Sequence, residues 1–428
     1  MVILPIIAMV IGLIIGVPIA FSLAGAGILG IWLMKGSWVA VLGMVGTVAY
    51  STASDYIMST IPAFILMAYL ASYSGLARDL FDVTSKWLSG LRGGLGIASI
   101  FANAIFGAMS GSSTAAASVF SNVAMPHMRR FRYSDTLSSG SVAVGSVLSI
   151  LIPPSGAAII YGIATETSIA KLLMAGFLPG VLLAILLALA IFIWVTVRPQ
   201  DAPRTEAISW AERWRSLYRI WPSLLLIVLV LVLLYSGIAT PTEVGALGAF
   251  VAAVIGIAMR RLTWSGALKA FSSTVRITTM IFLIIIGANI FGLFMTLSQV
   301  PMHIVAAMTS WNVNRYVVIL MIVVVYFAIS MFMDEIPLIL ITIQVTFPLI
   351  LALGFDPIWY GVMCVLMISM GLVFPPVGLC AFVVSAAANV DLVKVYKGTS
   401  VLVIAIIITT ALVLFFPQLA LWLPSTMR

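Results

Sequence analysis

The chain has 428 residues, of which 63% are hydrophobic and 8% are charged, and its mean hydropathy is +1.23. Soluble proteins carry about 25% charged residues, so this composition excludes a soluble globular enzyme and predicts an all-α, polytopic membrane protein. The net charge is +8. The basic residues lie between apolar segments rather than in one patch, so they indicate membrane topology and no nucleic-acid partner.

The first predicted unit, residues 1–92, consists of apolar segments that we expect to be N-terminal scaffold helices. Residues 93–197 are predicted to form the first repeat of a transport domain. Its segment from about 93 to 126 begins and ends beside basic residues that the positive-inside rule places in the cytoplasm. We therefore predict that it turns back at Ser110–Ser113, as a re-entrant hairpin or as two short spans.

Two proline pairs, Pro153-Pro154 and Pro375-Pro376, interrupt apolar segments of membrane length. Proline lacks the N–H that closes a helical turn, so each pair breaks a helix and frees carbonyl oxygens. In lipid this is tolerated only where the broken backbone is buried in protein or lines a cavity. The breaks share one frame: adding 222 to Pro126, Pro153, Pro154 and Gly156 gives Pro348, Pro375, Pro376 and Gly378. Paired broken helices in two halves are typical of secondary transporters.

Residues 198–314 are predicted to hold a linker and a second set of scaffold helices. The linker, Arg198 to Arg219, alternates tryptophan and arginine and is expected to lie on the inner membrane surface. Residues 315–398 are predicted to form the second transport repeat, with a hairpin turn at Met333–Glu335, and residues 399–428 a C-terminal helix.

The positive-inside rule puts every Lys and Arg in the cytoplasm except Lys171, Arg315 and Arg428. The loop that follows the first hairpin contains three arginines between Arg129 and Arg132. The matching loop after the second hairpin, Leu351 to Phe355, has no basic residue. Opposite loop charge indicates opposite orientation, so the halves are predicted to be an inverted-topology repeat.

Two groups of polar residues are candidates for chemistry. The turn Ser110–Thr114 offers hydroxyls and carbonyls, which are hard oxygen ligands suited to Na⁺, although small residues also serve close helix packing. Asp334 and Glu335 are the acids that this topology puts at membrane depth, where a charge is expensive and usually functional. Ion coordination, proton exchange and orientation of the turn all stay open as their role. No nucleotide-binding or metalloprotease motif occurs, so no enzymatic activity and no catalytic residue is expected.

At these residues the chain resembles the large membrane subunit of tripartite ATP-independent periplasmic (TRAP) transporters, nearly end to end. The motifs that carry the resemblance are Gly16-Val17-Pro18-Ile19-Ala20-Phe21, Ile61-Pro62-Ala63-Phe64, Ser110-Gly111-Ser112-Ser113, Leu151-Ile152-Pro153-Pro154-Ser155, Ala175-Gly176-Phe177-Leu178-Pro179-Gly180, Pro241-Thr242-Glu243, Met331-Phe332-Met333-Asp334 and Gly371-Leu372-Val373-Phe374-Pro375-Pro376-Val377-Gly378.

The resemblance implies a Na⁺-driven elevator transporter for an organic acid: a dicarboxylate, keto acid, sugar acid or sialic acid. It implies one Na⁺ among Ser110, Ser113, Ser149, Ile152 and Pro154, mostly on main-chain oxygens, and a second among Ser330, Gly371, Phe374 and Val377. Ser112, Ser155 and Asp334 are the expected substrate contacts. Ser149 stands where glycine is common and Phe374 where threonine is common; a carbonyl survives both changes, but a threonine hydroxyl is lost.

By the same resemblance, the chain is expected in the bacterial inner membrane, in contact with lipid, and with two protein partners. These are a small four-helix membrane subunit, expected as a separate chain because no such segment precedes residue 1, and a periplasmic substrate-binding protein. The alternatives are a stand-alone Na⁺- or H⁺-coupled anion transporter of related hairpin fold and a non-transport membrane scaffold. The paired broken helices argue against the scaffold.

Overall fold

The computed structural model describes residues 3–203, 208–300, 302–303, 306 and 314–427, and every regular element in these ranges is a helix. Six of the helices, or up to seven if a bent pair counts as one span, are long and apolar enough to cross a membrane. The structure thus confirms the predicted all-α, multi-pass class. Parts of the second scaffold segment, residues 301, 304–305 and 307–313, lie outside the described residues.

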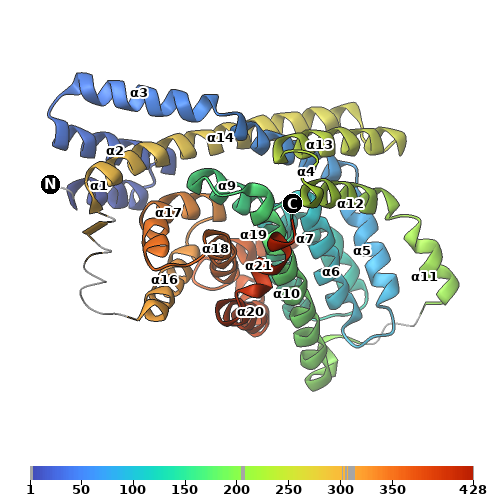
Figure 1. Cartoon of the computed structure of the whole chain (residues 1–428). Coiled ribbons are helices and arrows are strands. Elements are labelled where there is room, and N and C mark those ends of the chain that lie inside the picture. The colour runs from blue at the N-terminus through green and yellow to red at the C-terminus, as the bar shows by residue number, and fades with distance from the viewer. Residues whose placement is uncertain (1–2, 204–207, 301, 304–305, 307–313, 428) are drawn as a thin grey trace.

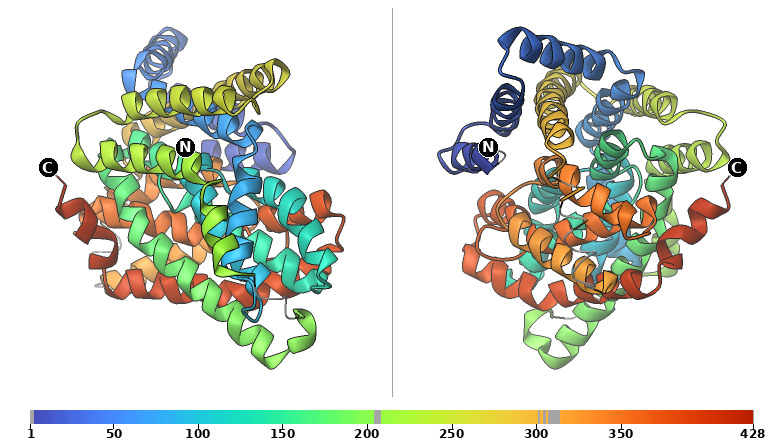
Figure 2. Two further views of the ribbon diagram at one scale, coloured as in Figure 1. Left: turned by 90° about the vertical axis from the view of Figure 1, so that its right-hand side faces the viewer. Right: turned by 60° about the vertical axis from the view of Figure 1, so that its left-hand side comes forward.

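One layer of the molecule consists of helices from the two predicted scaffold segments (Figures 1 and 2). They are α1 (Ile3–Ile14), α2 (Ile19–Lys35), α3 (Trp38–Ser54), α4 (Thr60–Tyr73), α12 (Trp221–Ser236), α13 (Pro241–Ala258) and α14 (Trp264–Leu297). The α2–α14 pair packs backbone against backbone: a Cβ atom at Gly27 would lie 2.8 Å from the main chain of Ile290, and one at Gly287 would lie 2.4 Å from the carbonyl oxygen of Ala20. Small residues allow this approach, as they do between helices in membranes.

Most of the remaining helices form a body beneath that layer in Figure 1. They are α6 (Gly94–Ser110), α7 (Ser113–Arg130), α8 (Asp135–Ser146), α9 (Gly156–Thr165), α10 (Ile169–Val197), α16 (Arg315–Ser330), α17 (Glu335–Ala352), α18 (Pro357–Gly371), α19 (Leu379–Ala388), α20 (Leu392–Phe415) and α21 (Gln418–Ser425). The boundary placed at 398/399 from the sequence falls inside α20, because no helix breaker occurs before Pro417, and α21 follows as a separate helix.

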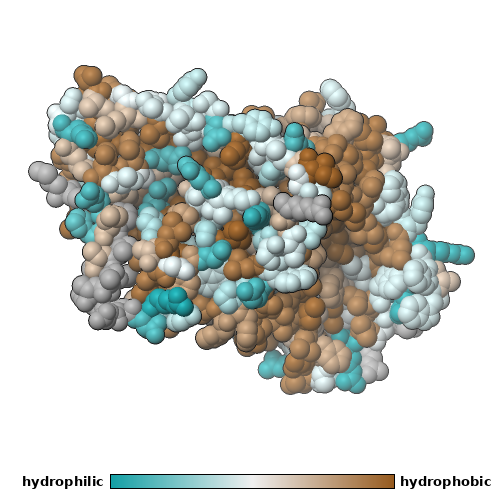
Figure 3. Space-filling model, in the orientation of Figure 1, coloured by the Kyte–Doolittle hydropathy of each residue, from teal (hydrophilic) through white to brown (hydrophobic). Residues whose placement is uncertain are grey.

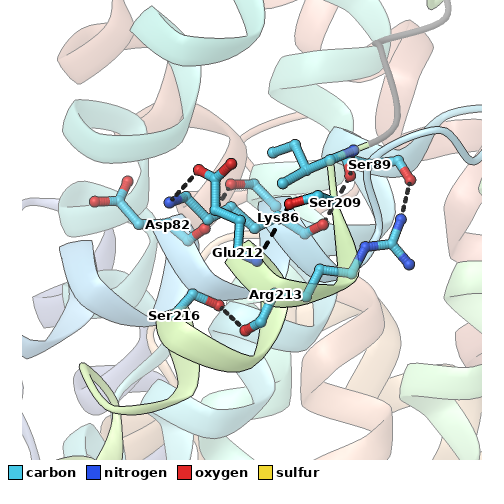
Figure 4. A network of polar contacts seen from close by, with 9 residues as sticks. Asp82, Lys86, Ser89, Ser209, Glu212, Arg213 and Ser216 are labelled. Atoms are coloured by element: carbon cyan, nitrogen blue, oxygen red, sulfur yellow. Dashed lines mark hydrogen bonds and ion pairs between the residues drawn. The ribbon is translucent and has the colours of Figure 1, made fainter.

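A short helix of the linker, α11 (Trp210–Leu217), docks on α5 (Leu76–Trp87) (Figure 4). Lys86 forms an ion pair with Glu212 at 3.1 Å, and the Arg213 guanidinium donates to the Ser89 carbonyl oxygen at 3.1 Å. The Trp87 ring meets the edge of Trp214 at 5.5 Å. These contacts fix the amphipathic linker against α5 and leave Trp214 63% exposed, as suits an interfacial helix.

The outer surface is strongly apolar. In Figure 3 hydrophobic side chains gather to the right of centre, over α10, α12 and α13. The exposed residues there include Ile185, Leu189 and Ile193 of α10 and Val228 and Val232 of α12, each half exposed or more. Such a surface suits contact with lipid tails rather than water.

The structure also contains the two helix pairs and the two broken segments that the 222-residue frame predicts. The α6–α7 pair turns at Gly111–Ser112, and the α16–α17 pair turns between Ser330 and Glu335. The helix ending at Ile150 resumes at Gly156, and the helix ending at Gly371 resumes at Leu379. The proline pair lies inside each gap.

Candidate substrate and cation site

A cavity of about 560 Å³ lies where the scaffold layer meets the body. On the scaffold side it is lined by α4, including Phe64, Tyr69 and Ser72, and by Ile277 to Ile281 of α14. On the body side it reaches the tips of both helix pairs and the first break. The cavity therefore touches both predicted repeats and the scaffold layer.

In the first half, the tip of the α6–α7 pair lies directly on the first break. The Gly156 N–H donates to the Gly111 carbonyl oxygen at 3.0 Å. Gly111 has φ +62°, and a Cβ there would lie 2.6 Å from the Pro154 carbonyl oxygen. Only glycine satisfies both demands, the left-handed backbone and the close approach.

The five residues predicted for the first cation lie around this contact. Ser110 ends α6, Ser113 begins α7, Ser149 lies in the 3₁₀ turn before the break, and Ile152 and Pro154 lie within the break. The hydroxyls of Ser110 and Ser149 are buried and, within the described residues, have no hydrogen-bond partner. Buried polar atoms are normally paired, so these two unpaired hydroxyls are the candidate ligand contacts at the first break.

Two of the predicted substrate contacts act as helix caps. The Ser155 hydroxyl donates to the Ile150 carbonyl oxygen and accepts the Ala158 N–H, so it bridges the break. Ser112 caps α7, lies beside Thr114 (3.2 Å between the hydroxyl oxygens) and lines the cavity. Ser155 is not among the residues that line the cavity. Of the two serines, the structure thus brings only Ser112 to the cavity.

The second half repeats the contact between tip and break, but the glycine and the serine have changed places: the serine lies on the helix pair and the glycine on the broken segment. The Gly378 N–H donates to the Met331 carbonyl oxygen at 3.1 Å, which joins tip and break. A Cβ at Gly371 would lie 1.9 Å from the Ser330 hydroxyl, whereas in the first half a Cβ at Gly107 would lie 2.7 Å from the Cα atom of Ser149. In each half a glycine on one helix thus lets a serine on the other approach closely.

The other predicted residues of the second cation set have partners in the protein. Phe374 packs on Phe327 with 5.3 Å between ring centroids. The Val377 carbonyl oxygen accepts the Tyr396 hydroxyl at 2.7 Å, and the Pro376 carbonyl oxygen accepts the same hydroxyl at 2.9 Å. Tyr396 was not predicted from the sequence, because nothing in its local pattern shows that α20 passes the second break.

Asp334 and Glu335 begin α17 and both line the cavity. Asp334 caps the helix, and its carboxylate accepts the Glu335 N–H at 3.0 Å. The Glu335 side chain is 2% exposed and accepts the Ser113 hydroxyl at 3.0 Å. The two residues are 222 positions apart, so the equivalent first residues of the second helices in the two repeats contact each other. The 222-residue frame relates position 113 to position 335, so this pair could have been predicted from the sequence.

Comparison with known proteins identifies the architecture. A sequence model of the family described as "Tripartite ATP-independent periplasmic transporter, DctM component" matches residues 6–419. The chain belongs to this family. It is 33% identical to the C4-dicarboxylate TRAP transporter large permease protein DctM of Pseudomonas aeruginosa over 88% of each chain. It is 31% identical to the ectoine TRAP transporter large permease protein TeaC of Halomonas elongata over 96% of each chain.

One further relative and one solved structure extend the comparison. The sialic acid TRAP transporter large permease protein SiaM of Vibrio cholerae is 29% identical over 96% of this chain and 95% of its own. Among solved structures, the YdaH transporter of Alcanivorax borkumensis matches with a TM-score of 0.57 and 16% identity, over 90% of this chain and 88% of that one. At that identity the second likeness concerns the fold alone. The chain is thus a multi-pass TRAP large permease subunit, and the resemblance drawn from its motifs is confirmed.

Proposed function

We propose that this permease imports an organic acid by Na⁺ coupling and an elevator movement. The observation that carries the proposal is the cavity between the scaffold layer and the two helix-pair tips. In this proposal the helix pairs are re-entrant hairpins that enter the membrane from opposite sides, in an inverted repeat. The body moves as one unit past the scaffold, and the cavity opens to either side in turn.

The first break supports Na⁺ as a co-transported ion. All candidate ligands there are oxygens, as hard cations prefer. The unpaired hydroxyls of Ser110 and Ser149 are free to turn a lone pair toward a cation. The second set offers the Ser330 hydroxyl and main-chain carbonyls near Gly371, but its Phe374 side chain supplies no oxygen. We propose both sets as Na⁺ sites, with the first as the better ligand set.

The cavity supports an anion held without a basic side chain. Its lining contains no Lys or Arg, but the N-terminal ends of α7, α9 and α17 all reach it. Helix N-termini attract negative groups through free N–H groups and the helix dipole. The Ser112 and Thr114 hydroxyls at the same place can donate to a carboxylate.

A substitution pair tests the ion site. Ser149 and Ser138 are both fully buried and both carry an unpaired hydroxyl, but Ser138 lies within α8, away from the break. Replacing an unpaired buried hydroxyl by hydrogen is neutral or stabilising if the hydroxyl only fills space. In Na⁺-driven uptake into proteoliposomes, Ser149→Ala is expected to raise the half-saturating Na⁺ concentration about tenfold, and Ser138→Ala to leave it unchanged. Equal Na⁺ affinities in the two variants would show that the Ser149 hydroxyl is not a Na⁺ ligand.

One observation favours a second class of substrate. The cavity is lined by two carboxyl groups, Asp334 and Glu335. These acids suit a zwitterion, whose positive group would face a carboxylate while its own carboxylate faces the helix N-termini. The relative TeaC is named as an ectoine permease, and ectoine is such a compound. Competition of ectoine and a C4-dicarboxylate against substrate uptake distinguishes the two classes.

We also propose the partners and the membrane: a small membrane subunit and a periplasmic binding protein, in the bacterial inner membrane. The absence of basic residues from the cavity lining supports the need for a binding protein, because a dilute acid outside would find no strong attractor on this chain.

A further inference from the structure

A second hollow lies on the outside of the body, where α10 and α20 pack side by side. It is a groove of about 690 Å³ that shares no lining residue with the cavity described above. Its walls are aliphatic: Leu189 and Ile193 come from α10, and Ile404 and Ile408 come from α20, each about half exposed. We call it the α10–α20 groove.

One end of the α10–α20 groove is basic. Arg198 directly follows α10, and Lys397 lies in the second turn of α20; both line the groove and are exposed. Neither forms an ion pair with a carboxylate in the part of the chain that the structure describes. Asp201 also lines this end, with its carboxylate accepting the Trp194 indole N–H at 2.9 Å. Two bases and one acid leave the end with a net charge of about +1 at neutral pH.

The groove has the dimensions of one membrane leaflet. From Lys397 to Ile408, α20 rises about 16 Å at 1.5 Å per residue. The hydrocarbon layer of one leaflet is about 15 Å deep. Arg198 and Lys397 belong to basic clusters that the positive-inside rule puts in the cytoplasm. With its basic end in the cytoplasmic headgroup region, a groove of this length reaches to about the middle of the bilayer.

We propose that the α10–α20 groove is a binding site for one anionic phospholipid of the cytoplasmic leaflet, phosphatidylglycerol. Its phosphate lies between the side chains of Arg198 and Lys397, and one acyl chain follows the aliphatic walls. The single negative charge of this lipid matches the net charge of the basic end, whereas a zwitterionic lipid leaves one positive charge unpaired in a region of low dielectric. Basic pockets between helices on the cytoplasmic side bind anionic headgroups in this way.

Native mass spectrometry of the purified full chain, titrated with phosphatidylglycerol, tests the site. Each base near a membrane surface contributes about a fivefold factor in affinity, so Arg198→Gln with Lys397→Gln is expected to weaken the tightest lipid site about 30-fold. The matched control is Lys394→Gln with Arg215→Gln, which removes the same charge from exposed positions outside the groove. It is expected to leave the affinity within twofold.

A second variant tests the apolar part. Ala190 lines the groove, so Ala190→Phe fills it while keeping both bases, and it is expected to weaken the same site at least tenfold. Unchanged affinity in the Arg198→Gln, Lys397→Gln protein would overturn the proposal. Phosphatidylethanolamine binding as tightly as phosphatidylglycerol would overturn the assignment of an anionic lipid. Lipid binding is read without Na⁺ or substrate, so either result is independent of the proposed transport function.

Discussion

The contact between tip and break in the first half can be broken by one methyl group, at Gly111. In Gly111→Ala the new Cβ atom would lie 2.6 Å from the Pro154 carbonyl oxygen, a main-chain atom that cannot turn aside. The alanine would also have to keep φ near +62°. We expect the tip to move away from the break and the Gly156–Gly111 hydrogen bond to open.

The free-energy cost of Gly111→Ala has three contributions. A left-handed conformation costs a non-glycine residue about 1–2 kcal/mol. Overpacking against a fixed neighbour adds about 1–3 kcal/mol, and the lost hydrogen bond adds about 0.5–1.5 kcal/mol. Gly354 provides a control for the first contribution alone, because its φ is +74° and a Cβ there would meet nothing within 4 Å. The difference between Gly111→Ala and Gly354→Ala is therefore expected to be about 1.5–4.5 kcal/mol.

Na⁺-driven uptake and thermal unfolding of both purified variants measure this difference. Gly354→Ala is expected to transport close to the normal rate. Gly111→Ala is expected to lose at least tenfold in uptake at subsaturating Na⁺, because 1.4 kcal/mol against the docked tip is a factor of ten in its population. If both variants show the same uptake and the same unfolding temperature, then the contact between the tip and the break does not stabilise the ion site.

Three further predictions address topology, coupling between the halves and partners. Single cysteines in Phe131→Cys and Leu353→Cys are expected to react with a membrane-impermeant thiol reagent from opposite sides of the membrane; labelling from one side contradicts the inverted repeat. Ser113→Ala and Glu335→Ala are expected to be non-additive in uptake, because each removes the same buried hydrogen bond; a double-mutant cycle whose effects simply add would show that the contact carries no coupling. The chain reconstituted alone is expected to show no Na⁺-driven uptake at micromolar substrate, and such uptake with neither partner present would contradict the need for partners. With both partners supplied, uptake that runs fully on a proton gradient in Na⁺-free buffer would contradict Na⁺ coupling.

Much of the architecture could be predicted from local rules. Proline breaks helices wherever it lies inside them, so the two pairs located both broken segments before any packing was known. The positive-inside rule acts on loops one at a time, and it supplied the predicted opposite orientation of the halves. The motifs around the first break supported the family, which the comparisons confirm. Helix extents were less certain: the structure carries α20 through the boundary predicted at 398/399.

The partners of individual side chains needed the three-dimensional structure. The sequence marked Ser155 as a substrate contact, but its hydroxyl bridges the first break and does not line the cavity. It left Glu335 without a role, and the fold gives it Ser113 as a hydrogen-bond partner. Tyr396 reaches the second break only because α20 passes beside it.

The sequence by itself thus determined where the chain is apolar and where its helices break, and it predicted which way its loops face, because these depend on a residue and its near neighbours. The tertiary structure decided which groups meet. Ser113 and Glu335 are 222 positions apart, and the residues that line the cavity come from separate segments spread between Ile61 and Val383. Such contacts arise only when distant helices pack, since no local pattern records which two surfaces will be buried against each other.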